Sequence, residues 1–230
     1  MDLTYQEKKK RLEAFFKKYD YDEEIEKFIL NSLSTNCMCD VISQAYSACD
    51  ILEEKDNMYL EFLTNLEKYF TLDHNIVDVG GGLYPALATY IKEKQVKLKK
   101  GTITVFDSDL VVNKLNGIVL KKELFTENTQ IENCDLIIGT YTCEATIPII
   151  RNARKNYIPF SIALCGCTHF SSQELNSIPY YANYQIQNLW NEYIMDEIYK
   201  DLPNDMEIKI DYFKNPYHPY PIITKTYKKW

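Results

Sequence analysis

Features that would point to a membrane, export or phosphate-transfer role are missing from this sequence of 230 residues. No apolar run reaches the roughly 18 residues that a membrane span needs. The N-terminal stretch lacks the apolar core of a secretory signal, so we expect a cytoplasmic protein. The phosphate-binding loop G-x-x-x-x-G-K-[ST] does not occur, and Pro85 stands where the dinucleotide fingerprint G-x-G-x-x-G needs its last glycine. Phosphoryl transfer from ATP is therefore not expected.

Basic residues are outnumbered, with 26 Lys and Arg against 33 Asp and Glu, which gives a net charge of −7. Most of the excess lies in residues 1–71, which hold 15 acidic and 9 basic residues. An acidic chain lacks the overall attraction to phosphate that drives non-specific nucleic-acid binding. We therefore favour a small molecule or a protein over RNA as partner, and we expect no membrane partner.

The first part of the chain has the periodicity of helices. Apolar residues recur at spacings of three and four, as in Leu12, Phe15, Phe16 and Tyr19, and no strand-like alternation occurs before residue 72. We predict an N-terminal helical cap over residues 1–71, which forms a lid or side wall for the domain that follows.

From residue 72 to residue 230 the pattern changes to strands alternating with helices. The predicted strands are 75–81, 101–107, 117–125, 134–141, 159–165, 206–213 and 221–229, and the predicted helices are 83–96, 143–156 and 186–202. Glu197 is the one polar residue on the apolar stripe of the last helix. Five strand–helix units predict a mostly parallel sheet covered on both faces. Two final strands without a helix between them predict that one strand runs antiparallel to the rest.

A glycine turn and an acid mark the carboxyl ends of the first two predicted strands. Residues 78–82 (DVGGG) end the first strand, and Asp107 ends the second. Glycines let the backbone turn tightly and approach a ligand, and a carboxylate after the second strand is suited to the two hydroxyls of a ribose. Open parallel sheets bind ligands at this edge. The alternative is a tight turn in a fold without a ligand.

The D-x-G-x-G turn, the acid after the second strand and the final pair of strands resemble class I S-adenosylmethionine-dependent methyltransferases over about residues 72–230. The resemblance implies a Rossmann-like α/β fold with a seven-stranded sheet, S-adenosylmethionine as cofactor and methyl transfer as activity. Tyr84 stands where the family often has a further glycine. The cofactor-binding residues that follow from the resemblance are Asp78, Gly80, Gly81, Gly82, Tyr84, Asp107, Ser108 and Tyr141.

A second resemblance lies downstream, in residues 139–146 (GTYTCEAT) and 159–169 (PFSIALCGCTH). These segments are similar to a subgroup of the same enzymes that carries G-x-H-x-[CD]-x-A-T after strand four and a cysteine-rich end to strand five. That subgroup includes tRNA ribose methyltransferases, and Tyr141 stands where it usually has histidine. An RNA methyltransferase and a non-catalytic binding protein with this fold therefore stay open as alternatives.

Methyl transfer from a sulfonium leaves a neutral product, so the protein mainly positions the two reactants. A base is needed only where the acceptor must lose a proton. Our candidate catalytic residues are Tyr141, Glu144 and His169. Tyr141 is expected in the pocket, Glu144 is a proton acceptor or a charge at a helix start, and His169 is a loop base or a surface residue.

The seven cysteines are predicted to be reduced thiols, since the number is odd and no export signal occurs. Cys165-x-Cys167-x-His169 and Cys37-x-Cys39 contain metal-ligand residue types. Paired cysteines of structural zinc sites are separated by about two or more residues, which is wider than here. The spacing therefore predicts no metal.

Overall fold

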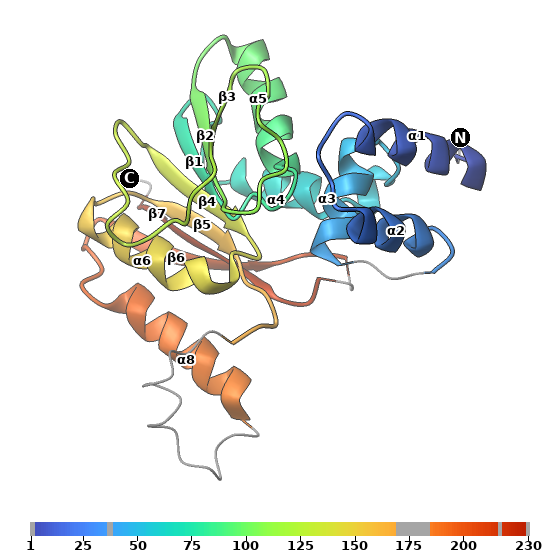
Figure 1. The fold of residues 1–230 in the computed structure, drawn as a ribbon. Coiled ribbons are helices and arrows are strands. Elements are labelled where there is room, and N and C mark those ends of the chain that lie inside the picture. The colour runs from blue at the N-terminus through green and yellow to red at the C-terminus, as the bar shows by residue number, and fades with distance from the viewer. Residues whose placement is uncertain (1–2, 36–38, 169–184, 216–217, 229–230) are drawn as a thin grey trace.

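The computed structural model describes residues 3–35, 39–168, 185–215 and 218–228. Its centre is one seven-stranded sheet with the order β3-β2-β1-β4-β5-β7-β6 (Figure 1). Strand β7 runs antiparallel to both of its neighbours, and the other pairs are parallel. The predicted Rossmann-like, mostly parallel sheet with one antiparallel strand is thereby confirmed. The strands are β1 Asn75–Val79, β2 Thr102–Phe106, β3 Ile118–Lys121, β4 Leu136–Thr140, β5 Phe160–Ala163, β6 Met206–Tyr212 and β7 Pro221–Tyr227.

Helices cover both faces of the sheet (Figure 1). They are α1 Tyr5–Phe16, α2 Glu23–Ser32, α3 Asp40–Ala48, α4 Met58–Leu66, α5 Ala86–Leu98, α6 Thr146–Lys155 and α8 Ile186–Tyr199, with short 3₁₀ turns at Glu54–Asp56 and Cys143–Ala145. Helices α4 and α5 lie on one face, α6 and α8 lie on the other, and α1 to α3 extend the first layer to one side. No helix within the described ranges is long and apolar enough to cross a membrane.

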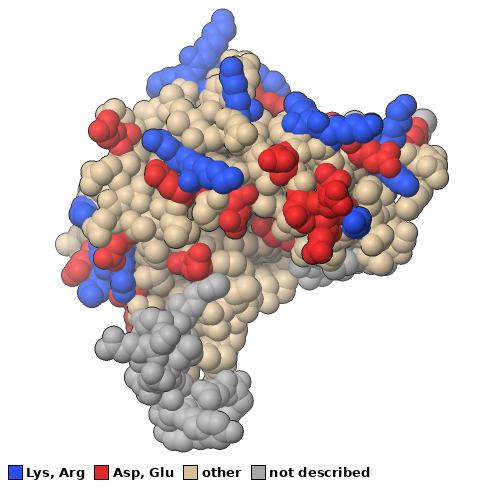
Figure 2. Space-filling model, viewed as in Figure 1, with Lys and Arg blue, Asp and Glu red and all other residues tan. Residues whose placement is uncertain are grey.

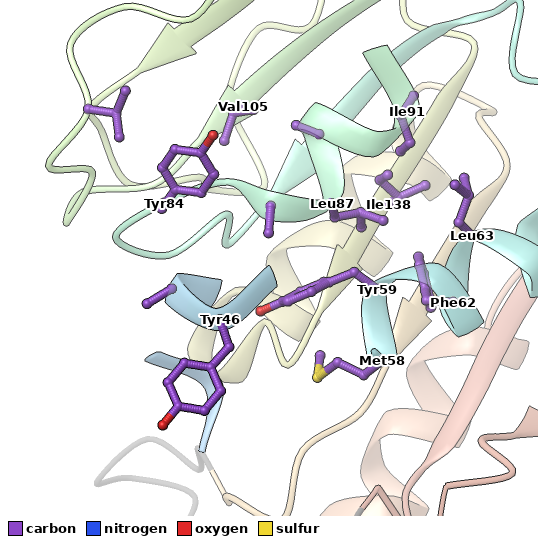
Figure 3. Close-up of a cluster of buried hydrophobic side chains, with 14 of the residues drawn as sticks. Tyr46, Met58, Tyr59, Phe62, Leu63, Tyr84, Leu87, Ile91, Val105 and Ile138 are labelled. Atoms are coloured by element: carbon purple, nitrogen blue, oxygen red, sulfur yellow. The ribbon is translucent and has the colours of Figure 1, made fainter. Parts of the chain in front are cut away.

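The alternation of side chains along each strand divides the interior into two apolar clusters. In β1, Ile76 belongs to the cluster beneath α4 and α5, and Val77 belongs to the cluster beneath α6 and α8. In the first cluster, Tyr59 and Phe62 of α4 lie near Leu87 of α5 and Ile138 of β4 (Figure 3). The N-terminal helices and one face of the sheet thus share a continuous core.

Two of the predicted strand–helix units are wrong. Strands β2 and β3, and likewise β3 and β4, are joined by segments 107–117 and 122–135, which contain no helix. Both segments are rich in Asp, Asn, Ser and Thr, whose side chains compete for backbone hydrogen bonds and favour turns. Non-helical residues therefore follow β2 and β3 at the carboxyl end of the sheet.

Helix α5 begins at Ala86 rather than at the predicted Leu83. Pro85 precedes it with φ −79° and ψ 72°, which is outside the helical region. The glycine turn is therefore separated from the helix by a short non-helical segment, residues 83–85, and the free N–H groups of α5 do not follow the glycines directly.

Candidate functional site

A cavity of about 620 Å³ opens at the carboxyl ends of β1, β2, β3 and β4. Its volume lies within the range of roughly 300–1,000 Å³ that is common for small-molecule sites. Six of the residues singled out from the sequence line it: Gly80, Gly82, Asp107, Ser108, Tyr141 and Glu144. Asp78, Gly81 and Tyr84 are not part of the lining, and His169 lies outside the described residues.

The glycine turn and the acid after β2 are in direct contact. Gly80 and Gly82 have φ values of +75° and +69°, in the left-handed region that favours glycine. The Gly82 amide donates to Asp107 Oδ2 at 2.8 Å, and the Asp109 amide donates to Asp107 Oδ1 at 2.7 Å. An ionised carboxylate has about four lone-pair sites, so Asp107 keeps acceptor capacity for a ligand while the backbone fixes its orientation.

Helix α3 forms a wall of the cavity through Asp40 and Gln44. Asp40 accepts hydrogen bonds from Gln44 Nε2 at 2.7 Å and from the Tyr59 hydroxyl at 2.8 Å. A Cβ atom on Gly82 would lie 1.9 Å from Gln44 Nε2, so only glycine fits beneath this helix. Helix α3 and the glycine turn therefore pack closely against one another.

Tyr84 packs against aromatic side chains in the interior and does not line the cavity. Its ring packs against Phe15 and Tyr19, with ring centroids 5.2 and 5.3 Å away, and the residue is 9% exposed. Its amide donates to Gln44 Oε1 at 3.3 Å. The side chain that replaces the further glycine thus points into the aromatic cluster beneath α1 and away from the cavity.

Acidic groups dominate the polar part of the cavity. Among the described residues that line it, none is Lys, Arg or His, and five are acidic: Asp40, Asp107, Asp109, Glu123 and Glu144. Acidic side chains also gather at α2, next to the cavity wall, on the face drawn in Figure 2. A lining of this kind suits a cationic ligand and disfavours a phosphate group.

Two of the acids near the glycine turn have raised pKa values. Burial raises the pKa of Asp78 to about 8, and the negative charges of Asp107 and Asp40 add to the shift. Asp78 is 1% exposed, and its Oδ2 has no hydrogen-bond partner. Burial also raises the pKa of Asp40 to about 6, against the opposing effect of its hydrogen bond from Tyr59. A nearby positive charge would stabilise the ionised form of both groups.

The rest of the lining combines apolar side chains with the turn after β4. Phe106, Leu83, Leu124 and Phe125 supply the apolar surface. Tyr141 follows β4, and its hydroxyl lies 2.6 Å from Nδ1 of His218, a buried residue of the β6–β7 connection. This hydrogen bond fixes the tyrosine in the cavity wall.

Sequence reasoning missed three residues at this site: Asp40, Gln44 and His218. Their partners are Tyr59, Tyr84 and Tyr141, respectively, and the contact between Tyr141 and His218 joins residues 77 positions apart. The sole local signal was the placement of Asp40 and Gln44 one helical turn apart in the predicted cap.

No protein-family model and no curated protein matches this sequence. Solved structures with a similar arrangement include a SAM-dependent methyltransferase from Aquifex aeolicus, at 12% identity and a TM-score of 0.46 over 79% of this chain and 96% of the other. Precorrin-6y C5,15-methyltransferase from Geobacter metallireducens GS-15 is 12% identical, with a TM-score of 0.45 over 75% and 88% of the two chains. The N-methyltransferase NodS from Bradyrhizobium japonicum WM9 is 11% identical, with a TM-score of 0.43 over 76% and 99%. At such identities, the ligand of this chain has to be argued from its own residues.

Proposed function

We propose that this chain binds S-adenosylmethionine in the acidic cavity and transfers the methyl group to a small-molecule or protein acceptor. The observation that carries the proposal is the lining itself. A glycine turn hydrogen-bonded to Asp107 lies among acidic side chains, with no basic side chain among the described residues of the lining. S-adenosylmethionine matches these features because it has a ribose, an apolar base and a net positive charge.

The residues that would hold the cofactor follow from their chemistry. Asp107 is suited to accept the ribose hydroxyls, because both of its oxygens are already oriented by backbone amides. Asp40 lines the cavity and supplies negative charge beside the glycine turn for the ammonium or the sulfonium. A bound positive charge nearby would also favour ionisation of the buried Asp78, whose pKa is raised in its absence. Phe106 and Phe125, whose rings are 5.4 Å apart, offer apolar surface for the adenine.

When bound, the cofactor supplies an electrophilic methyl group whose displacement leaves a neutral thioether. The protein therefore has to hold the acceptor in line with that methyl group and to keep water out. Tyr141, Thr142 and Glu144 extend from the end of β4 along the cavity and are placed to contact an acceptor. The acidic lining repels a phosphate backbone, which favours a small molecule or a protein side chain over RNA.

Binding can be tested by calorimetry with S-adenosylmethionine and S-adenosylhomocysteine on the full chain. We expect Asp107→Ala and Gly80→Val to weaken binding about a hundredfold, because each removes charge-assisted hydrogen bonds or the turn that orients them. Asp135→Ala is the matched control, since Asp135 also accepts a backbone amide, that of Asn75, but at the opposite end of the sheet. A folded wild type that binds neither compound would contradict the proposal, as would equal binding by Asp107→Ala and Asp135→Ala.

Turnover can be tested by incubating the protein with methyl-labelled cofactor and separate extracts of metabolites, proteins and RNA. We expect label in the metabolite or protein fraction, and Asp107→Ala should abolish it. Label confined to RNA would show that the acceptor is RNA rather than a small molecule or a protein. Cofactor binding without label in any fraction would show a binding protein that has this fold.

A further inference from the structure

Three thiols from two different strands meet beside the cavity. Cys143 follows β4, and Cys165 and Cys167 follow β5. The Sγ atoms of Cys143 and Cys165 are 3.6 Å apart, and all three sulfur atoms lie within 4.8 Å of one another. Cys143 also lines the cavity, so this cluster adjoins the candidate cofactor site.

These distances match the dimensions of a thiolate metal site. A metal–sulfur bond of about 2.3 Å in tetrahedral geometry places neighbouring sulfur atoms about 3.8 Å apart. Spacing along the chain argued against a metal because the cysteines of each pair, Cys165 with Cys167 and Cys37 with Cys39, are separated by a single residue. The fold brings in Cys143 from the neighbouring strand, and it supplies a ligand that the local spacing does not show.

The backbone that presents Cys143 is strained. Tyr141 and Cys143 have φ values of 54° and 47°, although neither residue type favours the left-handed region. Such conformations are energetically unfavourable and cluster at functional sites. The strained turn directs the Cys143 thiol toward Cys165. The rest of the fold therefore offsets the backbone strain that holds the three thiols together.

We propose that Cys143, Cys165 and Cys167 form a binding site for one thiophilic divalent cation, with Zn²⁺ as the ion to test. Thiolate ligands select soft or borderline metals over Mg²⁺ and Ca²⁺. Three protein ligands leave a further coordination position open, which is the arrangement of zinc sites that take part in reactions rather than in folding alone. This inference does not depend on the proposed cofactor.

The test uses the full chain, reduced with a phosphine and freed of metal with a chelator. Co²⁺ is added first, because thiolate-bound Co²⁺ gives charge-transfer absorption that Zn²⁺ then abolishes by displacement. We expect one Co²⁺ per chain, and at least about tenfold weaker binding in each of Cys143→Ser, Cys165→Ser and Cys167→Ser. Cys134→Ser is the matched control, since Cys134 precedes the same strand, β4, that Cys143 follows. It should bind Co²⁺ as the wild type does.

X-ray absorption on the Zn²⁺-loaded wild type gives a readout that does not depend on any variant folding. We expect three sulfur ligands at about 2.3 Å. A shell of nitrogen and oxygen alone would overturn the proposal. Absence of the charge-transfer band in the reduced wild type, or equal weakening by Cys134→Ser and Cys143→Ser, would also overturn it.

Discussion

Each face of the sheet buries one carboxylate, and the two carboxylates have opposite electrostatic environments. On the face beneath α6 and α8, Glu197 accepts hydrogen bonds from Arg151 at 3.3 Å and from Arg154 at 3.1 Å. Burial alone would raise its pKa, but the two guanidinium groups outweigh burial and lower it. On the face beneath α4 and α5, Asp78 faces two other acids, and burial and their charges raise its pKa to about 8.

The difference separates a structural acid from a candidate binding acid. Glu197 interrupts the apolar stripe of α8, but Arg151 and Arg154 of α6 neutralise its charge. The fold therefore explains its position. Asp78 Oδ2 has no hydrogen-bond partner among the residues that the structure describes, which costs stability unless a ligand supplies one. A buried acid that costs stability is expected at a site where function maintains it.

The largest effect is expected from Asp78→Asn, which removes the unpaired carboxyl while keeping its shape. We expect the free energy of unfolding at pH 7 to rise by about 3 kcal/mol, because ionisation of Asp78 is resisted in the folded protein alone. Affinity for S-adenosylmethionine should fall in the same variant. Urea denaturation and calorimetry measure the two effects, and a less stable variant would break the contrast with Glu197.

Glu197→Ala should have the opposite effect on stability. It leaves Arg151 and Arg154 partly buried without their carboxylate, and we expect a loss of about 2 kcal/mol, reduced from the fully buried case because Arg151 is more than a third exposed. Glu127→Ala is the control, since the more exposed carboxylate of Glu127 forms an ion pair with Arg151 on the same surface. Cofactor affinity should stay unchanged in both variants, and its loss in Glu197→Ala would remove the distinction between the two acids.

The pH dependence of stability should sharpen the comparison. Asp78 ionises near pH 3.8 in the unfolded chain and near pH 8 in the folded one, so the folded state holds the extra proton between these values. Its contribution to stability is therefore greatest at low pH and is lost as pH rises from about 4 to about 8, at up to about 1.4 kcal/mol per pH unit. The difference between wild type and Asp78→Asn, measured by denaturation at several pH values, isolates this slope. A difference that does not vary with pH would show that Asp78 ionises normally.

The smallest effect is expected for Tyr84→Phe. The ring keeps its packing against Phe15 and Tyr19, and we expect a change of less than about 1 kcal/mol in stability. Cofactor affinity should be the same as in the wild type, because the hydroxyl is not part of the cavity lining. A marked loss of affinity, measured by calorimetry, would return Tyr84 to the binding residues.

Much of the fold could be predicted because its signals are local. Short apolar and β-branched runs located the first five strands, and period-two alternation located the last two. The helix-free end of the chain placed the antiparallel pair. The turn and Asp107 were expected to meet because parallel strands end at the same edge of a sheet. The count of five strand–helix units was too high, because turn-forming polar segments rather than helices follow β2 and β3.

The parts that could not be predicted depend on contacts between distant segments. Gln44 accepts a hydrogen bond from the Tyr84 amide across 40 positions, and Cys143 meets Cys165 across 22. The spacing of apolar residues along the chain does not predict such contacts, because they depend on how α3 packs on the turn and on the pairing of β4 with β5. The acid-rich character of the cavity is likewise a property of five residues from separate loops and helices.

The most direct test of the account is a crystal structure of the full chain with S-adenosylmethionine. We predict the ribose hydroxyls at hydrogen-bond distance from Asp107 and the ammonium on the side of Asp40 and Asp78. A second cavity of about 800 Å³, lined by Leu60 of α4, Tyr212 of β6 and Lys68 after α4, offers an internal comparison. Cofactor bound there, with the acidic cavity empty, would contradict the account.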